Sequence, residues 1–204
     1  NKTLDRLSLP MPGNHNISNS LAAIAIARHL NIDENSIKKS LSSFKGVNRR
    51  FTQVAELNGI KIIDDYGHHP VEITYALSSG RILASKNKLI AIFQPHRYSR
   101  LKDLFDEFCQ CFNNADYVFI TDVYAAGESE IKNFNKETLA TGISDYGHNN
   151  VSIINNENEI CDKIHSIAKP NDVVIFLGAG SITKWSDTIV HQLNNSGLKN
   201  EKIF

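Results

Sequence analysis

The chain has 204 residues, of which 41% are hydrophobic and 22% are charged, as in an ordinary globular protein with a sizeable core. Its 22 basic and 22 acidic residues give a formal net charge of zero, which argues against a nucleic-acid binder or another polyanion binder. No apolar run approaches the roughly 20 residues of a membrane-spanning helix, and the three cysteines are expected to be free thiols of a reducing cytosol.

The first 46 residues predict a loop followed by two helices. Residues 10–14, Pro-Met-Pro-Gly-Asn, are typical of a loop, and the apolar spacing after them indicates a helix over about Ser18–Leu30. Asp33 is the expected N-cap of a second helix, which runs to about Phe44 before Gly46 ends it. Two helices of this size cannot enclose a core, and the chain does not begin with methionine. We therefore expect them to be the end of a domain that starts upstream.

Alternating strands and helices are predicted from Phe51 onward, with Asn58-Gly59 as a strong hairpin signal. The expected strands are Phe51–Leu57, Ile60–Asp64, Lys88–Phe93, Tyr117–Thr121, Val151–Ile154 and Asp172–Leu177. The expected helices are one that starts at Pro70, then Leu101–Phe112, Lys136–Tyr146, Glu157–Ala168 and Ile182–Leu193. Fully apolar runs such as Val173–Leu177 indicate burial on both faces. The sequence predicts an α/β fold, a mostly parallel sheet with helices on both faces, and an irregular tail over Asn194–Phe204.

Ionisable and small residues collect in the loops that follow four of these strands. In a parallel sheet, ligands lie beyond the carboxyl ends of the strands, so these loops should meet along one edge. The four loops are Asp64–Pro70 (Asp-Asp-Tyr-Gly-His-His-Pro), Gln94–Arg100 (Gln-Pro-His-Arg-Tyr-Ser-Arg), Thr121–Glu128 (Thr-Asp-Val-Tyr-Ala-Ala-Gly-Glu) and Gly178–Ser181 (Gly-Ala-Gly-Ser). Their convergence indicates a ligand site more strongly than any single residue does.

Asp64 and Asp65 are adjacent at a strand end, so one is expected to face inward and the other outward. They either complement the N-terminal charge of the following helix, or accept a ribose hydroxyl or orient a cation. His68 and His69, together with His96, raise the alternative of a zinc site. Neighbouring histidines seldom share one ion and no structural-zinc spacing occurs, so no metal site is predicted and hydrogen bonding to an anion or amine is preferred.

Arg97 and Arg100 lie three positions apart at the expected start of a helix and share a face. Two guanidinium groups beside free helix N–H groups form a strong site for a carboxylate or phosphate, and a solvated helix start without a ligand is the alternative. The Gly178–Ser181 turn is similar to the start of a dinucleotide-binding fingerprint, but Thr183 stands where a third glycine is expected. Tight packing of this turn is therefore favoured over anion contact, and no Gly-Lys-Ser or Gly-Lys-Thr phosphate loop occurs.

Taken in order, the motifs of the chain resemble those of the Mur ligase family. The general motifs are Gly13–Asn19 (Gly-Asn-His-Asn-Ile-Ser-Asn), Gly46–Phe51 (Gly-Val-Asn-Arg-Arg-Phe) and Asp64–Pro70. Two further stretches, Phe93–Arg100 and Asp122–Glu128, are similar to the members that add L-alanine. The resemblance extends over nearly the whole chain, and several motifs in the same order make it specific.

Mur ligases have a domain for the UDP sugar, a central ATPase domain and a Rossmann-like C-terminal domain. The resemblance implies that residues 1–46 are the end of the central domain and that residues 47–204 are the C-terminal domain. The positions that match the family's ATP contacts are His15, Asn16, Asn19, Arg50 and Asp65. The positions that match its pocket for the alanine carboxylate and the muramoyl end are Tyr66, His68, Arg97 and Arg100, and His68, Arg97 and Arg100 are also the expected catalytic residues.

The resemblance implies ATP-dependent ligation of L-alanine to the carboxylate of UDP-N-acetylmuramate through an acyl phosphate, in the cytoplasm, for peptidoglycan synthesis. ATP and Mg²⁺ are expected to be held mainly by the remaining domains of the same polypeptide, so this chain alone should be inactive. Nucleic acid and membrane are not expected partners. Two alternatives stay open. One is a ligase that joins a recycled murein tripeptide to UDP-N-acetylmuramate, against which residues 95–100 argue. The other is a non-catalytic α/β module that binds nucleotides or anions.

Overall fold

The computed structural model of the chain describes residues 6–11, 13–44, 46–195 and 200–203. The chain divides into two compact units, Asn1–Asn48 and Arg49–Phe204, and each is described by itself.

The first unit contains the two predicted helices, α1 (Asn14–His29) and α2 (Glu34–Ser43). Helix α1 begins four residues earlier than predicted, directly after Gly13, whose φ of 101° is a conformation that favours glycine. The predicted N-cap of α2 is confirmed, because Asp33 Oδ1 accepts a hydrogen bond of 3.0 Å from the backbone N–H of Ser36.

Seven strands of the second unit form one sheet in the order β5-β4-β3-β6-β2-β1-β7. The strands are β1 (Thr52–Leu57), β2 (Ile60–Asp65), β3 (Leu89–Phe93), β4 (Tyr117–Ile120), β5 (Val151–Ile153), β6 (Val173–Leu177) and β7 (Asn200–Ile203). Strands β2 to β6 are parallel, whereas β1 pairs antiparallel with both β2 and β7. The predicted hairpin is confirmed, since Asn58 and Gly59 join β1 to β2 with φ values of 48° and 76°.

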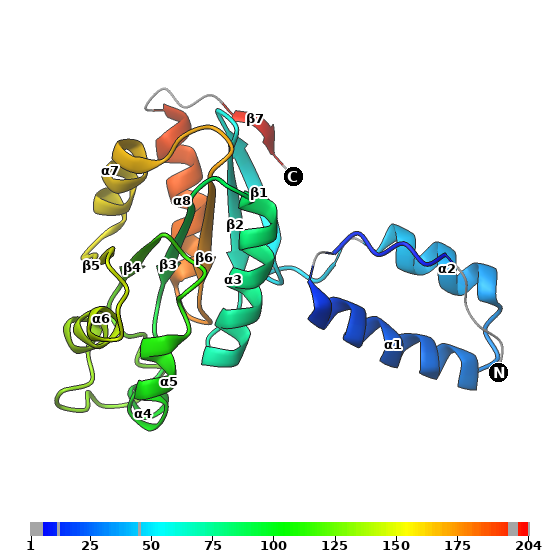
Figure 1. Ribbon diagram of the computed structural model, residues 1–204, viewed down its shortest axis with the longest axis horizontal. Coiled ribbons are helices and arrows are strands. Elements are labelled where there is room, and N and C mark those ends of the chain that lie inside the picture. Colours follow the sequence, from blue (N-terminus) through cyan, green and yellow to red (C-terminus); the bar gives the residue numbers. More distant parts are fainter. Residues whose placement is uncertain (1–5, 12, 45, 196–199, 204) are drawn as a thin grey trace. The chain divides into compact units, whose positions relative to one another are not determined.

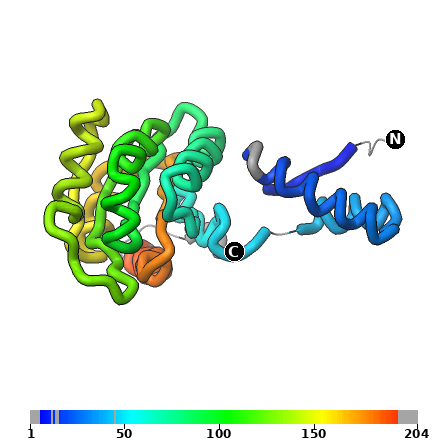
Figure 2. Tube along the Cα trace, turned by 90° about the horizontal axis from the view of Figure 1, so that it is seen from below, coloured from blue at the N-terminus to red at the C-terminus, as the bar shows by residue number. Residues whose placement is uncertain are grey.

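Helices cover both faces of this sheet, as predicted (Figure 1). The helices α3 (Pro70–Ala84), α4 (Tyr98–Asp103), α5 (Phe105–Gln110) and α6 (Lys136–Asp145) pack on one face. The helices α7 (Glu157–Ile167) and α8 (Ile182–Asn195) pack on the other. Figure 2 shows α3 in green and α8 in orange-red on opposite sides of the strands. The molecule is therefore a three-layer α/β structure in this unit.

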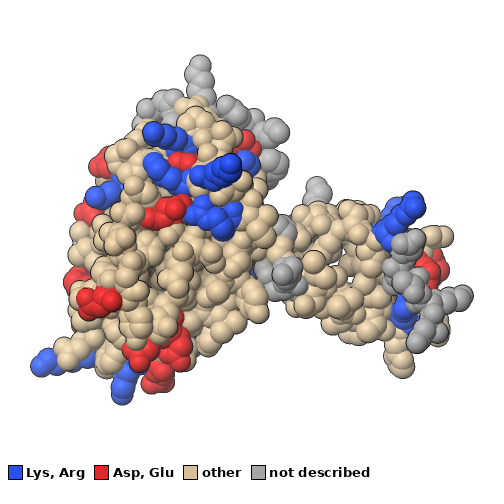
Figure 3. Space-filling view, in the orientation of Figure 1, with Lys and Arg blue, Asp and Glu red and all other residues tan. Residues whose placement is uncertain are grey.

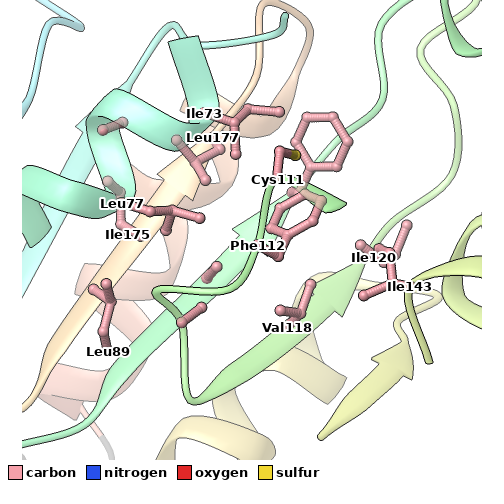
Figure 4. Packing of buried hydrophobic residues seen from close by; sticks show 14 of the residues in the cluster. Ile73, Leu77, Leu89, Cys111, Phe112, Val118, Ile120, Ile143, Ile175 and Leu177 are labelled. Carbon is pink, nitrogen blue, oxygen red and sulfur yellow. The ribbon is translucent and has the colours of Figure 1, made fainter. Parts of the chain in front are cut away.

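The strands are apolar at every position because each face of the sheet has its own core. Successive side chains of a strand point to opposite faces, so Leu89 and Phe93 join the core under α3 whereas Ile90 and Ile92 join the core under α8. Figure 4 shows the first core, where Leu77 of α3 lies beside strand β6. All five residues of β3 are fully buried.

The direction of the connections decides which face each helix covers. From β2 to β5 the chain steps toward the β5 edge, and α3 to α6 all lie on one face; from β5 it steps back to β6, and α7 lies on the other. This change of face is what right-handed crossovers require. As a result, β6 lies between β2 and β3. The helix that follows β6 (α8) lies on one face of the sheet, whereas the helices that follow β2 (α3) and β3 (α4) lie on the other. Ligands bind at such a reversal in open α/β sheets.

Two predictions about regular structure are wrong. The expected helix Leu101–Phe112 is broken at Leu104, whose φ of −123° and ψ of 28° separate α4 from α5. Neither glycine nor proline occurs in this segment, so its sequence carries no signal for the break. The tail expected to be irregular from Asn194 contains strand β7, which pairs with β1 at the sheet edge.

The packing of α6 on α5 can be tested at Gly142. A Cβ atom added there would lie 2.5 Å from Cys109 Sγ and 3.1 Å from the ring of Phe105. We expect Gly142→Ala to lower the free energy of unfolding by about 1 kcal/mol or more, because overpacking exceeds the gain in helix propensity. Urea unfolding of the chain measures this effect. Ser144→Ala, an exposed substitution on the same helix, should change stability by less than about 0.5 kcal/mol. Equal stability of both variants would contradict the packing.

Candidate functional site

The loops that follow β2, β3, β4 and β6 lie together along the lower edge of the sheet in Figure 1, where α3, α4 and α8 begin. The loops after β3 and β4 are joined by backbone hydrogen bonds. The N–H of Arg97 donates to the carbonyl of Tyr124 over 2.8 Å, and the N–H of Tyr124 donates to the carbonyl of Pro95 over 2.8 Å. The predicted convergence of these loops is confirmed.

Four aromatic rings from three of these loops form a continuous row. The ring centroids of Tyr66 and His68 are 5.1 Å apart, those of His68 and His96 are 5.7 Å apart, and those of His96 and Tyr124 are 5.4 Å apart. The last pair is stacked, and the first meets edge to face. We call Tyr66, His68, His96 and Tyr124 the ring row.

Glu72 of α3 fixes the backbone on which His68 stands. Its carboxylate accepts hydrogen bonds from the N–H groups of His68 (3.1 Å) and His69 (3.3 Å), as part of a capping box. Nδ1 of His68 lies 2.9 Å from the carbonyl oxygen of Tyr66. Because a carbonyl oxygen can only accept, this hydrogen bond is made by the tautomer that carries a proton on Nδ1, and in that tautomer Nε2 is an acceptor.

His96 is bonded to Arg100, one of the two predicted arginines. Nη1 of Arg100 donates to the carbonyl oxygen of His96 over 3.2 Å and to its Nδ1 over 3.3 Å. Burial lowers the pKa of His96, and the charges of His68, Arg100 and Arg97 lower it further. The imidazole of His96 is therefore neutral near pH 7.

Glu128 holds the start of α4 in place of a local cap. Its carboxylate accepts hydrogen bonds from the N–H (2.9 Å) and the hydroxyl (2.7 Å) of Ser99, and it lies 3.7 Å from Nη1 of Arg97. These partners lower the pKa of Glu128, the backbone bond from Ser99 most. Arg97 itself precedes α4 with a φ of 73°. The expected use of free N–H groups at this helix start is wrong for Ser99, because its N–H is already bonded to a carboxylate.

Asp64 and Asp65 are both buried, with 3% and 7% of their surface exposed, so the expectation that one faces outward is wrong. Helices cover both faces of the sheet, and either side of the strand is therefore enclosed. The carboxylate of Asp65 accepts backbone hydrogen bonds of 2.7 Å from Gly67 and from Phe51. Burial nevertheless raises the pKa of Asp65.

The glycine turn after β6 is packed against Gln94. Oε1 of Gln94 accepts a hydrogen bond of 3.0 Å from the N–H of Ile182, and its Nε2 donates to the hydroxyl of Ser181 over 3.1 Å. A Cβ atom at Gly178 would come within 2.9 Å of the carbonyl oxygen of Gln94. These contacts support the tight-packing interpretation of the turn, since one of its helix N–H groups is occupied by the protein.

The residues expected to contact ATP lie in both units. Asn16 and the exposed Asn19 are on α1 in the first unit, and the side chain of His15 lies outside the described residues. Arg50 and Asp65 are in the second unit, where Nη1 of Arg50 lies 3.7 Å from Glu72 and the Arg50 side chain is 56% exposed.

Three side chains of this edge were not predicted to be part of the site. His96 was expected only in the zinc alternative, and Gln94 and Tyr124 only as members of their loops. The signal for the ring row is the presence of aromatic residues in three loops that are predicted to meet. Among the residues that the structure describes, no group of three or more histidine, cysteine, aspartate and glutamate side chains is arranged to hold a metal ion.

The charges on the surface of the second unit are mixed in sign. The face seen in Figure 3 carries lysines and arginines near aspartates and glutamates in the second unit. Within the described ranges, no helix is both long enough and apolar enough to cross a bilayer.

The pKa of Asp64 provides a test of the electrostatics at this edge. Burial raises it to about 6, against the attraction of Arg49, whereas an unfolded chain has a value near 3.9. Between about pH 4 and 6 the folded state keeps a proton that the unfolded state loses. Stability relative to Asp64→Asn should therefore fall by roughly 2–3 kcal/mol as the pH rises through this window. Urea unfolding of both proteins from pH 4 to 7 measures the difference. A relative gain with rising pH would mean that the ion pair outweighs burial.

Comparisons with known proteins identify the relatives of the chain. The family described as Mur ligase, glutamate ligase domain, matches residues 49–180. UDP-N-acetylmuramate–L-alanine ligases of Cereibacter sphaeroides and Rhodospirillum centenum are 49% and 48% identical to the chain, over 93% and 95% of its length. The crystal structure of UDP-N-acetylmuramate–alanine ligase from Thermotoga maritima is 30% identical, with a TM-score of 0.77, and 93% of the chain and 40% of that structure are aligned.

A murein peptide ligase from Psychrobacter arcticus has the same fold, with a TM-score of 0.64 and 22% identity over 93% of the chain and 39% of that structure. The chain spans about 40% of the length of the curated relatives that it matches. The family match covers more than half of the chain, and the resemblance of its motifs is thereby confirmed. The chain belongs to the Mur ligase family.

Proposed function

We propose that the chain is the C-terminal portion of an ATP-dependent ligase that joins L-alanine to the carboxylate of UDP-N-acetylmuramate in the cytoplasm, for peptidoglycan synthesis. The observation that carries this proposal is the row of Tyr66, His68 and His96 rings at the carboxyl edge of the sheet, with Arg100 bonded to His96 and Arg97 next to His96 in the chain. The relatives at 48–49% identity that are named for this reaction support it.

In the proposed reaction, the muramoyl carboxylate attacks the γ-phosphate of ATP and forms an acyl phosphate with release of ADP. The uncharged amine of L-alanine then attacks the acyl carbon, the amide bond forms as the nitrogen loses a proton, and phosphate leaves with the electrons of the broken C–O bond. Negative charge develops on oxygen in both steps, so placed cations stabilise the transition states. Mg²⁺ supplies such charge at the phosphates, and no residue of this chain is assigned to it.

Arg97 and Arg100 are the proposed clamp for the carboxylate of L-alanine. Guanidinium groups form strong hydrogen bonds with carboxylates. The side chain of Arg97 is half exposed, and its ion-pair partner Glu128 lies 3.7 Å away, so its guanidinium can still bind a carboxylate. His68 and Tyr66 are the proposed walls of the same pocket. The acceptor Nε2 of His68 suits the ammonium or amine hydrogens of the substrate.

Contacts with ATP are proposed for His15, Asn16, Asn19, Arg50 and Asp65. Each carboxylate oxygen of Asp65 accepts one backbone hydrogen bond, and a carboxylate oxygen can accept another, so a ribose hydroxyl can still be bound there. Residues 1–46 are the proposed end of the central ATP-binding domain, and residues 47–204 are the proposed C-terminal domain.

The exposed side chains of the first unit support that assignment. Leu21, Ile26 and Leu30 of this unit are 60%, 62% and 64% exposed. Exposed large apolar residues along α1 and at its C-terminal end are typical of a surface that other parts of a domain cover. We propose that the remaining residues of the central domain cover it.

The proposed reaction is tested in the full-length ligase that carries this chain. ADP release should require both UDP-N-acetylmuramate and L-alanine, and L-alanine should be used in preference to a murein tripeptide in a direct competition. Preference for the tripeptide would favour the recycling ligase instead. Micromolar ATP binding without any ligation would favour the non-catalytic α/β module.

The proposed carboxylate clamp is tested by Arg97→Ala in the same enzyme. We expect kcat/KM for L-alanine to fall by an amount equivalent to roughly 2–4 kcal/mol, because a charged hydrogen-bond donor to the substrate is lost. Lys102→Ala removes an exposed cation from the same helix and serves as the matched control, with unchanged kinetics. An unchanged kcat/KM in Arg97→Ala would remove this residue from the site.

A further inference from the structure

Arg49 and Asp64 have no part in the proposed contacts with alanine or nucleotide, although both stand at the edge that carries the site. Asp64 is 3% exposed, and the side chain of Arg49 is 28% exposed. A carboxylate and a guanidinium withdrawn from water in this way lose much of their hydration, and their mutual attraction seldom returns more than that loss. The pair therefore calls for an explanation other than stability.

The ion pair is also incompletely bonded. Nε of Arg49 lies 3.6 Å from Oδ2 of Asp64, which is an ion-pair distance but exceeds that of a hydrogen bond. Among the described residues, neither this Nε atom nor Oδ1 of Asp64 has a hydrogen-bond partner. Buried polar atoms without partners reduce stability further.

What the pair does is connect three segments of the carboxyl edge. Nη2 of Arg49 donates to the carbonyl oxygen of Gly178 over 2.8 Å, which ties it to the turn after β6. Its guanidinium carbon lies 4.6 Å from the centroid of the Tyr66 ring, which is a cation–π contact. The backbone carbonyl of Arg49 also accepts the N–H of Tyr66 over 2.7 Å. Arg49 therefore contacts both the main chain and the ring of Tyr66.

The ring of Tyr66 is the first member of the ring row. It meets His68 edge to face at 5.1 Å, and His68 in turn lies 5.7 Å from His96. A rotation of the Tyr66 ring would change the first of these contacts directly. The orientation of the Arg49 guanidinium therefore affects the position of Tyr66 and His68, which belong to the proposed alanine pocket.

We infer that Arg49 and Asp64 are positioning residues for Tyr66: Asp64 orients the guanidinium of Arg49, and the guanidinium holds the Tyr66 ring against the substrate pocket. The inference rests on the proposed function in one respect, namely that Tyr66 borders the site for L-alanine. It requires no contact between either residue and the substrate.

The orientation of the ring is tested first on this chain, without any activity. The ring resonances of Tyr66, assigned with Tyr66→Phe, are compared by NMR in Asp64→Asn and Arg49→Lys. Lysine keeps the positive charge. Its ammonium, however, is not planar, so it cannot stack on the Tyr66 ring and donate to the carbonyl of Gly178 at the same time, as the guanidinium does. Both variants should shift the Tyr66 ring resonances. Asp187→Asn is the matched control, because this exposed carboxylate acts on Asp64 only through its charge, and it should leave the ring unchanged.

The consequence for the substrate is tested in the full-length ligase. KM for L-alanine should rise about tenfold in Asp64→Asn and in Arg49→Lys, and KM for ATP should change less than about twofold, since a displaced pocket wall affects one substrate only. The double variant should be no worse than the single variants, because each breaks the same contact. Asp187→Asn should keep both KM values.

Each result separates the two hypotheses. A wild-type enzyme that does not use L-alanine overturns the proposed function, and the ring resonances still decide whether Arg49 and Asp64 position Tyr66. Unchanged ring resonances in both variants overturn the positioning inference, whatever the activity. Shifted resonances with an unchanged KM for L-alanine also overturn it, because the ring would then not matter to the pocket. If Asp64→Asn does not fold, Arg49→Lys carries both measurements.

Discussion

The handedness of the crossover connections is the constraint on which the rest of this structure depends. Strand β6 is added between β2 and β3 by a connection that runs against the preceding ones, so a right-handed crossover must place α7 on the opposite face. The helices that follow β6 and its neighbours then diverge. Four loops that contain ionisable or small residues lie at the carboxyl edge of the sheet, and side chains that are distant in sequence become neighbours there.

Covering both faces of the sheet has an electrostatic consequence at the same edge. Carboxylates at the end of β2 are enclosed on either side of the strand, and burial raises the pKa values of both Asp64 and Asp65. Asp65 obtains backbone donors for both oxygens, whereas Asp64, within the described part of the chain, faces the cation of Arg49 at 3.6 Å and keeps Oδ1 without a hydrogen-bond partner. The protein thus holds charge where it is costly, and the proposed benefit is a fixed geometry of the residues beside it.

Local signals in the sequence were sufficient for much of the fold. The hairpin at Asn58-Gly59, the cap at Asp33 and the start of α3 at Pro70 follow from the backbone preferences of these residue types, which act within a few positions. The break at Leu104 occurs in a segment without glycine or proline, and strand β7 forms by pairing with β1, which lies far along the chain, so neither had a local signal. The family resemblance came from ordered motifs, and it was confirmed.

The sequence by itself determined which residue types stand at the ends of the strands, and through the apolar runs it determined that these ends share one edge. Only the tertiary structure decided how the side chains are used there. In the fold, the N–H of Ser99 donates to Glu128, the side chain of Gln94 packs against the glycine turn, and the ring of His96 lies beside that of His68. Hydrogen bonds and ring contacts of this kind depend on positions a few ångströms apart in space. Residue identity and spacing along one chain do not contain those distances.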